Sequence, residues 1–413
     1  MANYFVNVET YNKSNLALLQ NAYTFINLAN KQFKDFDRQI PANKGSSVSF
    51  DLPPRMTVNN SLVASFQDVE QRQVTLTCNQ EASVAYNFDT SQFIFNAREY
   101  MDKFGRSAVA ALGSQVEKNI ALNAETNTYR FYGSTVNGIP SFAGLAQALE
   151  KFRETGTVRS KTVGILPTTA ISDIVNNGLG QFVLNRNDKM ANSWELGSFS
   201  GCEWYTSNLL PSHTAGSEGQ QASTLTVVSV TKNADDAVTS IVFSGCNAAN
   251  DPDSVKAYDK FQFNDGVSGY SNLRYLTEFG KVTTSSPVQF AATANAASTA
   301  GSQVTVSINP PLKASAGRNQ NINHEIVAGM QASVLKSHRC GLLMCDSPLY
   351  LAMPKLPDEV PYPTSSLVDP ASGAALRQYY GSLFGQDSRG MVHDVLWGSH
   401  LVDSYAMLLV FPA

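Results

Sequence analysis

The chain has 413 residues and a formal net charge of −4, and 43% of its residues are hydrophobic while only 15% are charged. Its length predicts two or three structural units, because one hydrophobic core rarely serves more than about 250–300 residues. The sequence has neither the Lys/Arg cluster of a dedicated nucleic-acid-binding protein nor an apolar run long enough to span a membrane, which argues against both classes.

The low charged fraction indicates that much of the surface meets protein instead of water. Soluble domains contain about 25% charged residues, and charged residues are depleted in permanent interfaces. A dry-cored enzyme would show the same composition. The N-terminus has no basic flank before an apolar core, so no secretory signal is expected. The five scattered cysteines predict reduced thiols in the cytosol.

A first amphipathic helix is predicted between Asn15 and Phe33, with Ser14 at the N-cap position. Apolar residues recur at intervals of three and four, namely Leu16, Leu19, Tyr23, Ile26 and Ala29. A break at Lys44–Ser47 follows soon afterwards. The apolar face is therefore expected to dock on an element elsewhere in the structure, as an arm.

Alternating apolar and polar residues dominate the next stretch. The segment 48–52 has the period of two that is typical of a strand with one buried face. Two more alternations follow at Val74–Cys78 and Val84–Phe88. Residues 41–90 are therefore predicted to form a long antiparallel excursion with a polar tip near Asn59.

A long helix is predicted from Ala97 to Ala124, because this stretch contains no proline and carries a continuous stripe. The stripe consists of Met101, Phe104, Ala108, Ala111, Leu112, Gln115, Val116 and Ile120. Such a helix is about twice the globular average in length, which is typical of a spine. A helix at Leu145–Arg153, a buried strand at Thr162–Leu166 and a helix opened by Pro167 then predict an α+β unit.

Helical periodicity disappears for about a hundred residues after a polar linker near Ala215. Six short strands are predicted there, at Ser223–Val230, Val238–Ser244, Lys260–Asn264, Leu273–Thr277, Val288–Ala294 and Val304–Ile308. This spacing is typical of a small barrel or sandwich, which Pro310-Pro311 is expected to close. The α+β character returns beyond residue 323, with an apolar run at Gly341–Cys345 and a last strand at Tyr405–Phe411.

Two clusters of reactive side chains favour structural roles. His338, Cys340 and Cys345 lack the paired spacing of a zinc site, and the apolar residues between the thiols predict a buried strand. No metal or cofactor is therefore predicted.

The second cluster, His393, Asp394 and Ser399, supplies acid, base and hydroxyl groups close together. Ser399 lacks the Gly-x-Ser-x-Gly elbow of a hydrolase, so a turn before the final strand explains the cluster better. A cytosolic hydrolase that uses these residues remains an alternative.

In their shared order, several stretches resemble the coat proteins of short-tailed bacteriophages whose shell subunit carries an inserted β domain. These stretches are Gly45–Phe50, Phe199–Cys202, Leu209–Pro211, Asp259–Phe263, Val288–Thr293, Val304–Leu312 and Val395–Gly398. The resemblance implies the α+β fold of the tailed-phage major capsid protein with an all-β insertion domain. It also implies a structural subunit without catalytic activity.

The resemblance implies a definite order of domains. These are an N-terminal arm (1–40), an extended β loop (41–78), a peripheral domain with the spine helix (79–130), an axial domain in two parts (131–216 and 323–395), an all-β insertion domain (217–322) and a returning peripheral strand (396–413). The residues expected at subunit contacts are Leu19, Tyr23, Ile26, Val48, Phe50, Leu52 and Arg55.

The implied function is self-assembly, as hexamers and pentamers, into an icosahedral shell that encloses packaged double-stranded DNA. Assembly is expected in the host cytoplasm, with scaffolding and portal proteins as partners, non-specific contact with DNA and no membrane. Two structural alternatives stay open. One is a non-viral compartment shell of the same fold, which would enclose a cargo enzyme, and the other is a carbohydrate-binding virion accessory protein that uses the β module.

Overall fold

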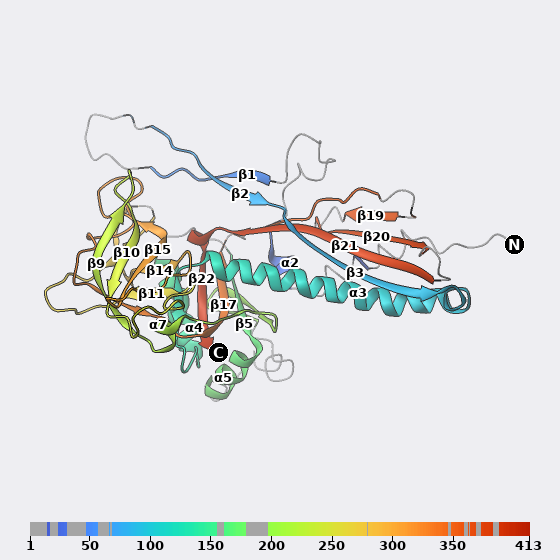
Figure 1. The fold of residues 1–413 in the computed structure, drawn as a ribbon, viewed down its shortest axis with the longest axis horizontal. Coiled ribbons are helices and arrows are strands. Elements are labelled where there is room, and N and C mark those ends of the chain that lie inside the picture. The colour runs from blue at the N-terminus through green and yellow to red at the C-terminus, as the bar shows by residue number, and fades with distance from the viewer. Residues whose placement is uncertain are drawn as a thin grey trace. The chain divides into compact units, whose positions relative to one another are not determined.

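A computed structural model describes residues 15–16, 24–30, 47–56, 66, 68–154, 161–178, 197–278, 280–345, 348–358, 362, 364–368, 373–382 and 388–413. The chain divides into two compact units (Figure 1). The first comprises Met1–Asp51, Gln73–Ala124 and Ser347–Leu401, and the second comprises Leu52–Arg72, Glu125–Asp346 and Val402–Ala413. The structure is strand-rich, with 44% strand and 19% helix, so the α+β prediction is confirmed in this coarse sense.

The first unit combines one long helix with an antiparallel sheet. The helix is α3 (Thr90–Asn127), and the strands are β3 (Gln80–Asp89), β18 (Leu349–Ala352), β19 (Thr364–Val368), β20 (Ala375–Ser382) and β21 (Ser388–Leu401). β21 lies at the centre, because it pairs with β3, β18 and β20. Its side chains Met391, Val395 and Trp397 are buried.

The predicted long helix is confirmed as α3, and its predicted stripe is confirmed in part, because Ala108, Leu112, Val116 and Ile120 are buried. The buried positions run through Val109, Leu112, Val116, Ile120 and Ala124. By contrast, Phe104, Ala111 and Gln115 of the predicted stripe are exposed. Several alanines in a row allow more than one apolar register on a helix, so local spacing alone could not select the buried one.

The arm docks on its own chain through α2 (Thr24–Leu28), whose residues Phe25 and Ile26 are fully buried. The backbone N–H groups of Phe25 and Ile26 donate to Glu117 Oε1 and Oε2 at 2.8 and 3.2 Å. The first turn of a helix leaves its N–H groups without intrahelical partners, and the Glu117 carboxylate of α3 supplies those partners. Docking on a distant element is thus confirmed, whereas the predicted cap at Ser14 lies outside the described residues.

The predicted extended loop begins and ends in a two-stranded sheet of β1 (Ser47–Leu52) and β2 (Arg72–Thr77). Exposed and covered residues alternate along both strands, as predicted. The Phe50 ring lies 4.1 Å from the Tyr350 ring, beside buried Leu76. The third alternation is not part of this hairpin, because β3 pairs with β21 instead, and the predicted tip near Asn59 lies outside the described residues.

The second unit is built on a mixed sheet in the order β4-β22-β17-β5-β7-β6, with β8 beside β17. Its strands are β4 (Phe131–Gly133), β5 (Thr162–Pro167), β6 (Ser198–Phe199), β7 (Cys202–Ser207), β8 (Ser212–His213), β17 (His338–Cys345) and β22 (Ala406–Pro412). The apolar runs predicted as strands become the central β5, β17 and β22, which are buried almost throughout. Helix α4 (Phe142–Glu154) packs on this sheet, and α5 (Thr168–Gly178) and the short η2 (Asp403–Tyr405) complete the layer.

Strand pairing changes two of the expected domain bounds. Strands between residues 349 and 401 belong to the first unit, together with β3. Most of these residues are expected from the sequence in the second axial part (323–395). The expected returning strand (396–413) is divided, because β21 ends at Leu401 and β22 joins the sheet of the second unit. Pairing between residues this distant leaves no local signal.

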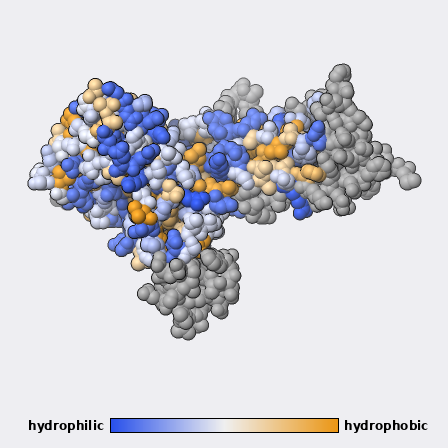
Figure 2. Space-filling view, turned by 60° about the horizontal axis from the view of Figure 1, so that its bottom comes forward, coloured by the Kyte–Doolittle hydropathy of each residue, from blue (hydrophilic) through white to orange (hydrophobic). Residues whose placement is uncertain are grey.

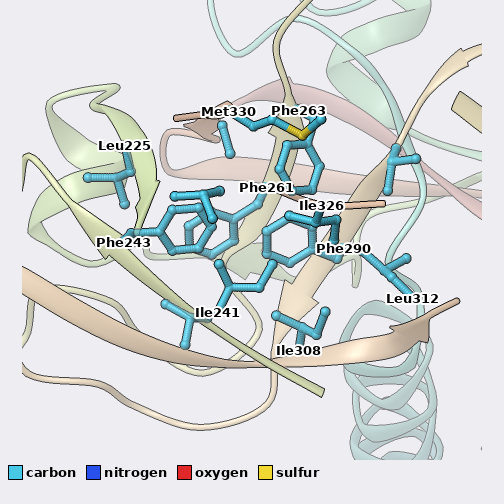
Figure 3. Packing of buried hydrophobic residues seen from close by; sticks show 14 of the residues in the cluster. Leu225, Ile241, Phe243, Phe261, Phe263, Phe290, Ile308, Leu312, Ile326 and Met330 are labelled. Carbon is cyan, nitrogen blue, oxygen red and sulfur yellow. The ribbon is translucent and has the colours of Figure 1, made fainter. Parts of the chain in front are cut away.

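A closed six-stranded barrel, in the order β10-β15-β14-β11-β16-β9, forms the other part of the second unit. Its strands are β9 (Thr224–Lys232), β10 (Val238–Ser244), β11 (Lys260–Phe263), β14 (Gln289–Ala292), β15 (Gln303–Leu312) and β16 (Gln331–Val334), and the short α7 (Ser217–Gln220) precedes them. Three nearly parallel rings lie in the barrel core (Figure 3). The ring centroid of Phe261 lies 5.0 Å from that of Phe290 and 5.9 Å from that of Phe243. The predicted all-β module is therefore a barrel.

Three details of the barrel differ from the prediction. The sixth strand is β16, which lies beyond the expected bound at 322 and pairs with β9 and β11. The predicted strand Leu273–Thr277 leaves the barrel as β12 (Arg274–Leu276) and pairs with β13 (Thr283–Pro287). Pro310 and Pro311 do not close the module, because β15 continues through them to Leu312.

Candidate interaction surfaces

The residues considered for hydrolysis are held in separate structural contacts. His393 is fully buried, and its Nε2 lies 3.2 Å from the Tyr86 hydroxyl. Asp394 accepts from Arg377 Nε at 3.0 Å, across the β20–β21 pair. Ser399 Oγ accepts from the Asn123 amide at 3.0 Å. These three side chains bond to different partners and do not form a relay.

The thiols considered as metal ligands are buried. Burial raises the pKa of Cys340 well above its ordinary value, so this thiol stays protonated. Burial also lowers the pKa of His338 to about 4, and its Nδ1 lies 2.8 Å from the Lys336 carbonyl oxygen. Among the described residues, no group of three His, Cys, Asp or Glu side chains is arranged to hold a metal ion.

A buried charged network, which the sequence analysis missed, joins the barrel to the sheet within the second unit. Lys260 Nζ is inaccessible to solvent and donates to the backbone oxygen of Glu125 at 3.0 Å. Asp259 Oδ1 lies 2.8 Å from His213 Nε2, and Asp259 Oδ2 accepts from the backbone of Gly216 at 3.1 Å. The adjacent charges Asp259-Lys260, placed directly before an apolar strand, were the available signal.

The middle of the extended hairpin carries large apolar side chains in water. Phe66 is 102% exposed, Val69 63% and Met56 47%. Ion pairs flank them: Arg55 Nε lies 3.1 Å from Glu278 Oε1, and Arg318 lies 3.0 Å from Glu70. Three large apolar side chains exposed beside paired charges make this segment a candidate for contact with another protein.

The predicted contact residues differ in how much of each side chain is exposed. Ile26 is fully buried and Leu52 is 7% exposed, within the chain itself. Val48 and Phe50 are partly exposed, and Arg55 is paired with Glu278. Leu19 and Tyr23 lie outside the described residues. Contact of any of them with a neighbouring subunit stays a prediction.

The described surface also carries apolar patches between hydrophilic residues (Figure 2). The barrel unit contributes exposed Val282 (63%), Val327 (44%) and Val228 (39%). Within the described residues, no helix is both long and apolar enough to cross a membrane. The exposed valines are further candidates, besides the hairpin, for contact with another protein.

Several solved structures that are similar to the chain come from bacteriophages. One, from Mycobacterium phage Che8, has 11% sequence identity and a TM-score of 0.47, and covers 94% of this chain and 90% of its own. The capsid of Ralstonia phage GP4 has 6% identity and a TM-score of 0.42, and covers 89% and 83%. The capsid of Cyanophage P-SCSP1u has 12% identity and a TM-score of 0.40, and covers 89% and 84%.

The structures from Ralstonia phage GP4 and Cyanophage P-SCSP1u are phage capsids. No protein-family model matches the chain, and no curated protein matches it either. Because the TM-scores are below 0.5, the function rests on the geometry of the chain itself.

Proposed function

We propose that the chain is the major capsid subunit of a tailed bacteriophage, which self-assembles into an icosahedral shell around packaged double-stranded DNA. The observation that carries the proposal is the extended hairpin, whose side chains Phe66, Val69 and Met56 stand in water. Hexamers and pentamers of the same chain are the proposed assembly units. Scaffolding and portal proteins are the proposed partners during assembly in the host cytoplasm.

The hairpin needs a neighbour for physical reasons. A two-stranded sheet is marginally stable by itself in water, and unpaired strand edges invite pairing with another chain. Complete burial of one Phe side chain contributes about 1.5–3 kcal/mol. A second copy that covers Phe66 and its neighbours would gain that free energy, and symmetric repetition of the contact would close a shell.

The domain names apply to the chain as part of this proposal. We assign the arm to α2, the extended loop to β1 and β2 with the residues between them, and the peripheral domain to α3 with the β21 sheet. The axial domain corresponds to the sheet that contains β17 and β22. The insertion domain corresponds to the barrel, up to β16.

A substitution at Phe66 tests the assembly role. Wild-type protein is expected to form closed shells in negative-stain images. Phe66→Ser should lower shell yield by about tenfold or more, which corresponds to the loss of one buried aromatic contact. The unfolding free energy of the unassembled subunit should not change, because Phe66 makes no buried contact within the subunit.

Val136→Ser is the matched control, because Val136 is 72% exposed on a turn outside the hairpin. This variant should assemble like the wild type. Equal shell yields for Phe66→Ser and Val136→Ser would count against the hairpin as an assembly contact. Small, uniform oligomers of the wild-type protein under all conditions would overturn the capsid proposal itself.

A further inference from the structure

A cavity of about 340 Å³ lies in the second unit, where three segments of the chain meet. The hairpin contributes Arg55 and Arg72, the segment after α3 contributes Arg130, and the flank of the barrel contributes Lys281 and Lys313. The volume lies in the range of small-molecule sites.

Cationic side chains outnumber carboxylates in this cavity. The carboxylates that line it are Asp235, Glu278 and Asp403. Burial raises the pKa of Asp403 and lowers the pKa of Lys281. Glu278 Oε1 is shared by Arg55 at 3.1 Å and Arg72 at 3.4 Å. The remaining positive charge of Arg130, Lys281 and Lys313 therefore favours an anion.

The same cavity holds a buried donor and a buried acceptor that no described residue satisfies, besides the Ser404 hydroxyl, which could serve as either. The donor is Arg130 Nε, on a side chain of a residue that is only 6% exposed, and the acceptor is Glu278 Oε2. The other end of Arg130 donates through its terminal nitrogen to the backbone oxygens of Asp403, at 3.4 Å, and Ser404. Leaving such buried groups without hydrogen-bond partners is destabilising.

We propose that this cavity is a binding site for hydrogen phosphate. The anion would accept from Arg130 Nε and from the Lys313 ammonium, and its own O–H would donate to Glu278 Oε2. Guanidinium groups bind phosphoryl oxygens strongly because these hydrogen bonds are charge-assisted. Sulfate has the same shape but no O–H, so it would leave Glu278 Oε2 unsatisfied and place two negative charges together.

The site would also have a structural consequence. Its ligands come from the segment after α3 at Arg130, from the β12–β13 turn at Glu278 and from the barrel at Lys313, so a bound phosphate would draw these segments of one chain together. This inference goes beyond the proposed shell function and does not depend on it.

Titration calorimetry on the full-length unassembled chain tests the site, with phosphate, sulfate and chloride compared at equal ionic strength. Phosphate should bind at least about tenfold more tightly than sulfate, because only phosphate satisfies the Glu278 acceptor. Glu278→Gln should narrow that preference, since an amide can donate to sulfate. Indistinguishable binding of phosphate and sulfate by the wild type would overturn the proposal.

Lys313→Gln is the second variant, because no hydrogen bond of the described structure uses its ammonium group. It should weaken phosphate binding by about tenfold, the value of one hydrogen bond to a charged group. Lys232→Gln is the matched control, since Lys232 lies on the same barrel in an exposed pair with Asp236. An equal loss in both variants would show a general charge effect and count against the site.

A short DNA duplex distinguishes free phosphate from the phosphodiester of nucleic acid. The diester carries no O–H, so the duplex should not displace bound phosphate at equal phosphate concentration. Complete displacement would overturn the assignment to free phosphate.

Discussion

His393 illustrates how one buried side chain makes the stability of the molecule depend on pH. Burial lowers its pKa from 6.5 to about 4. The folded state therefore resists protonation of this imidazole, while the unfolded chain accepts a proton below pH 6.5. The stability that the neutral imidazole contributes is complete above the unfolded pKa and is lost as the pH falls toward the folded pKa.

From these values, His393 should lower the unfolding free energy by about 2 kcal/mol between pH 7 and pH 5. Urea unfolding at both pH values measures this loss. Carboxylates that titrate in the same pH range contribute equally to the wild type and to His393→Asn, so the difference between the two proteins isolates the contribution of His393. His393→Asn should show a pH dependence smaller by that amount. An unchanged pH dependence would mean that the imidazole is protonated in the folded state.

Single residues were the hardest features to predict. His393 and Asp394 are adjacent in the sequence, but His393 bonds to Tyr86 and Asp394 bonds to Arg377. These partners become neighbours only through sheet register. The adjacent charges of Asp259 and Lys260 were a local signal of the buried network, but nothing local identifies the partner of Lys260, because Glu125 lies 135 residues away.

At the scale of elements, one carboxylate of α3 forms hydrogen bonds to the backbone of α2. Glu117 is 1% exposed and accepts from two backbone N–H groups of α2. Glu117→Ala should destabilise the docked arm by about 2 kcal/mol, because charge-assisted hydrogen bonds of buried groups are lost. Hydrogen exchange at Phe25 and Ile26 should therefore accelerate.

The neighbouring Lys118, exposed on the same helix, provides the control. Lys118→Ala keeps helix propensity and removes no described contact with the arm, so exchange in α2 should stay at the wild-type rate. Equal rates in all three proteins would mean that apolar burial of Phe25 and Ile26 alone holds the arm.

Elements with a local pattern were predictable, and elements defined by distant pairing were not. The alternation in 48–52 reappears as the burial pattern of β1, and five of the six predicted barrel strands are in the barrel. β16 was missed because Gln331–Val334 is short and weakly apolar. The pairing of β3 could not be predicted because its partner strand β21 is remote: Tyr86 and Met391 are 305 residues apart.

At the scale of the whole molecule, the barrel is a contiguous part of the chain whose two ends meet. The backbone N–H of Ala215 donates to Ser337 Oγ at 3.1 Å, at the entry and exit of the barrel. Adjacent ends and a core of its own are typical of a module that folds by itself. Its core includes the fully buried rings of Phe243, Phe261 and Phe290.

A fragment of residues 215–337 should therefore be soluble and unfold cooperatively, as measured by circular dichroism during heating. A fragment of residues 217–322, the bounds expected from the sequence, should fail to do so. It lacks β16, so β9 and β11 would keep unpaired edges and the barrel would stay open. Equal cooperativity in the two fragments would show that closure by β16 is dispensable.

The division of the first unit into three chain segments has a consequence during synthesis. Its central strand β21 (Ser388–Leu401) lies in the third of these segments, after all the barrel strands in chain order. On a ribosome, the barrel is therefore complete in the emerging chain before β3 can receive its partner β21. The first unit can form only after β21 has emerged, so a shorter nascent chain carries a finished barrel and an incomplete first unit.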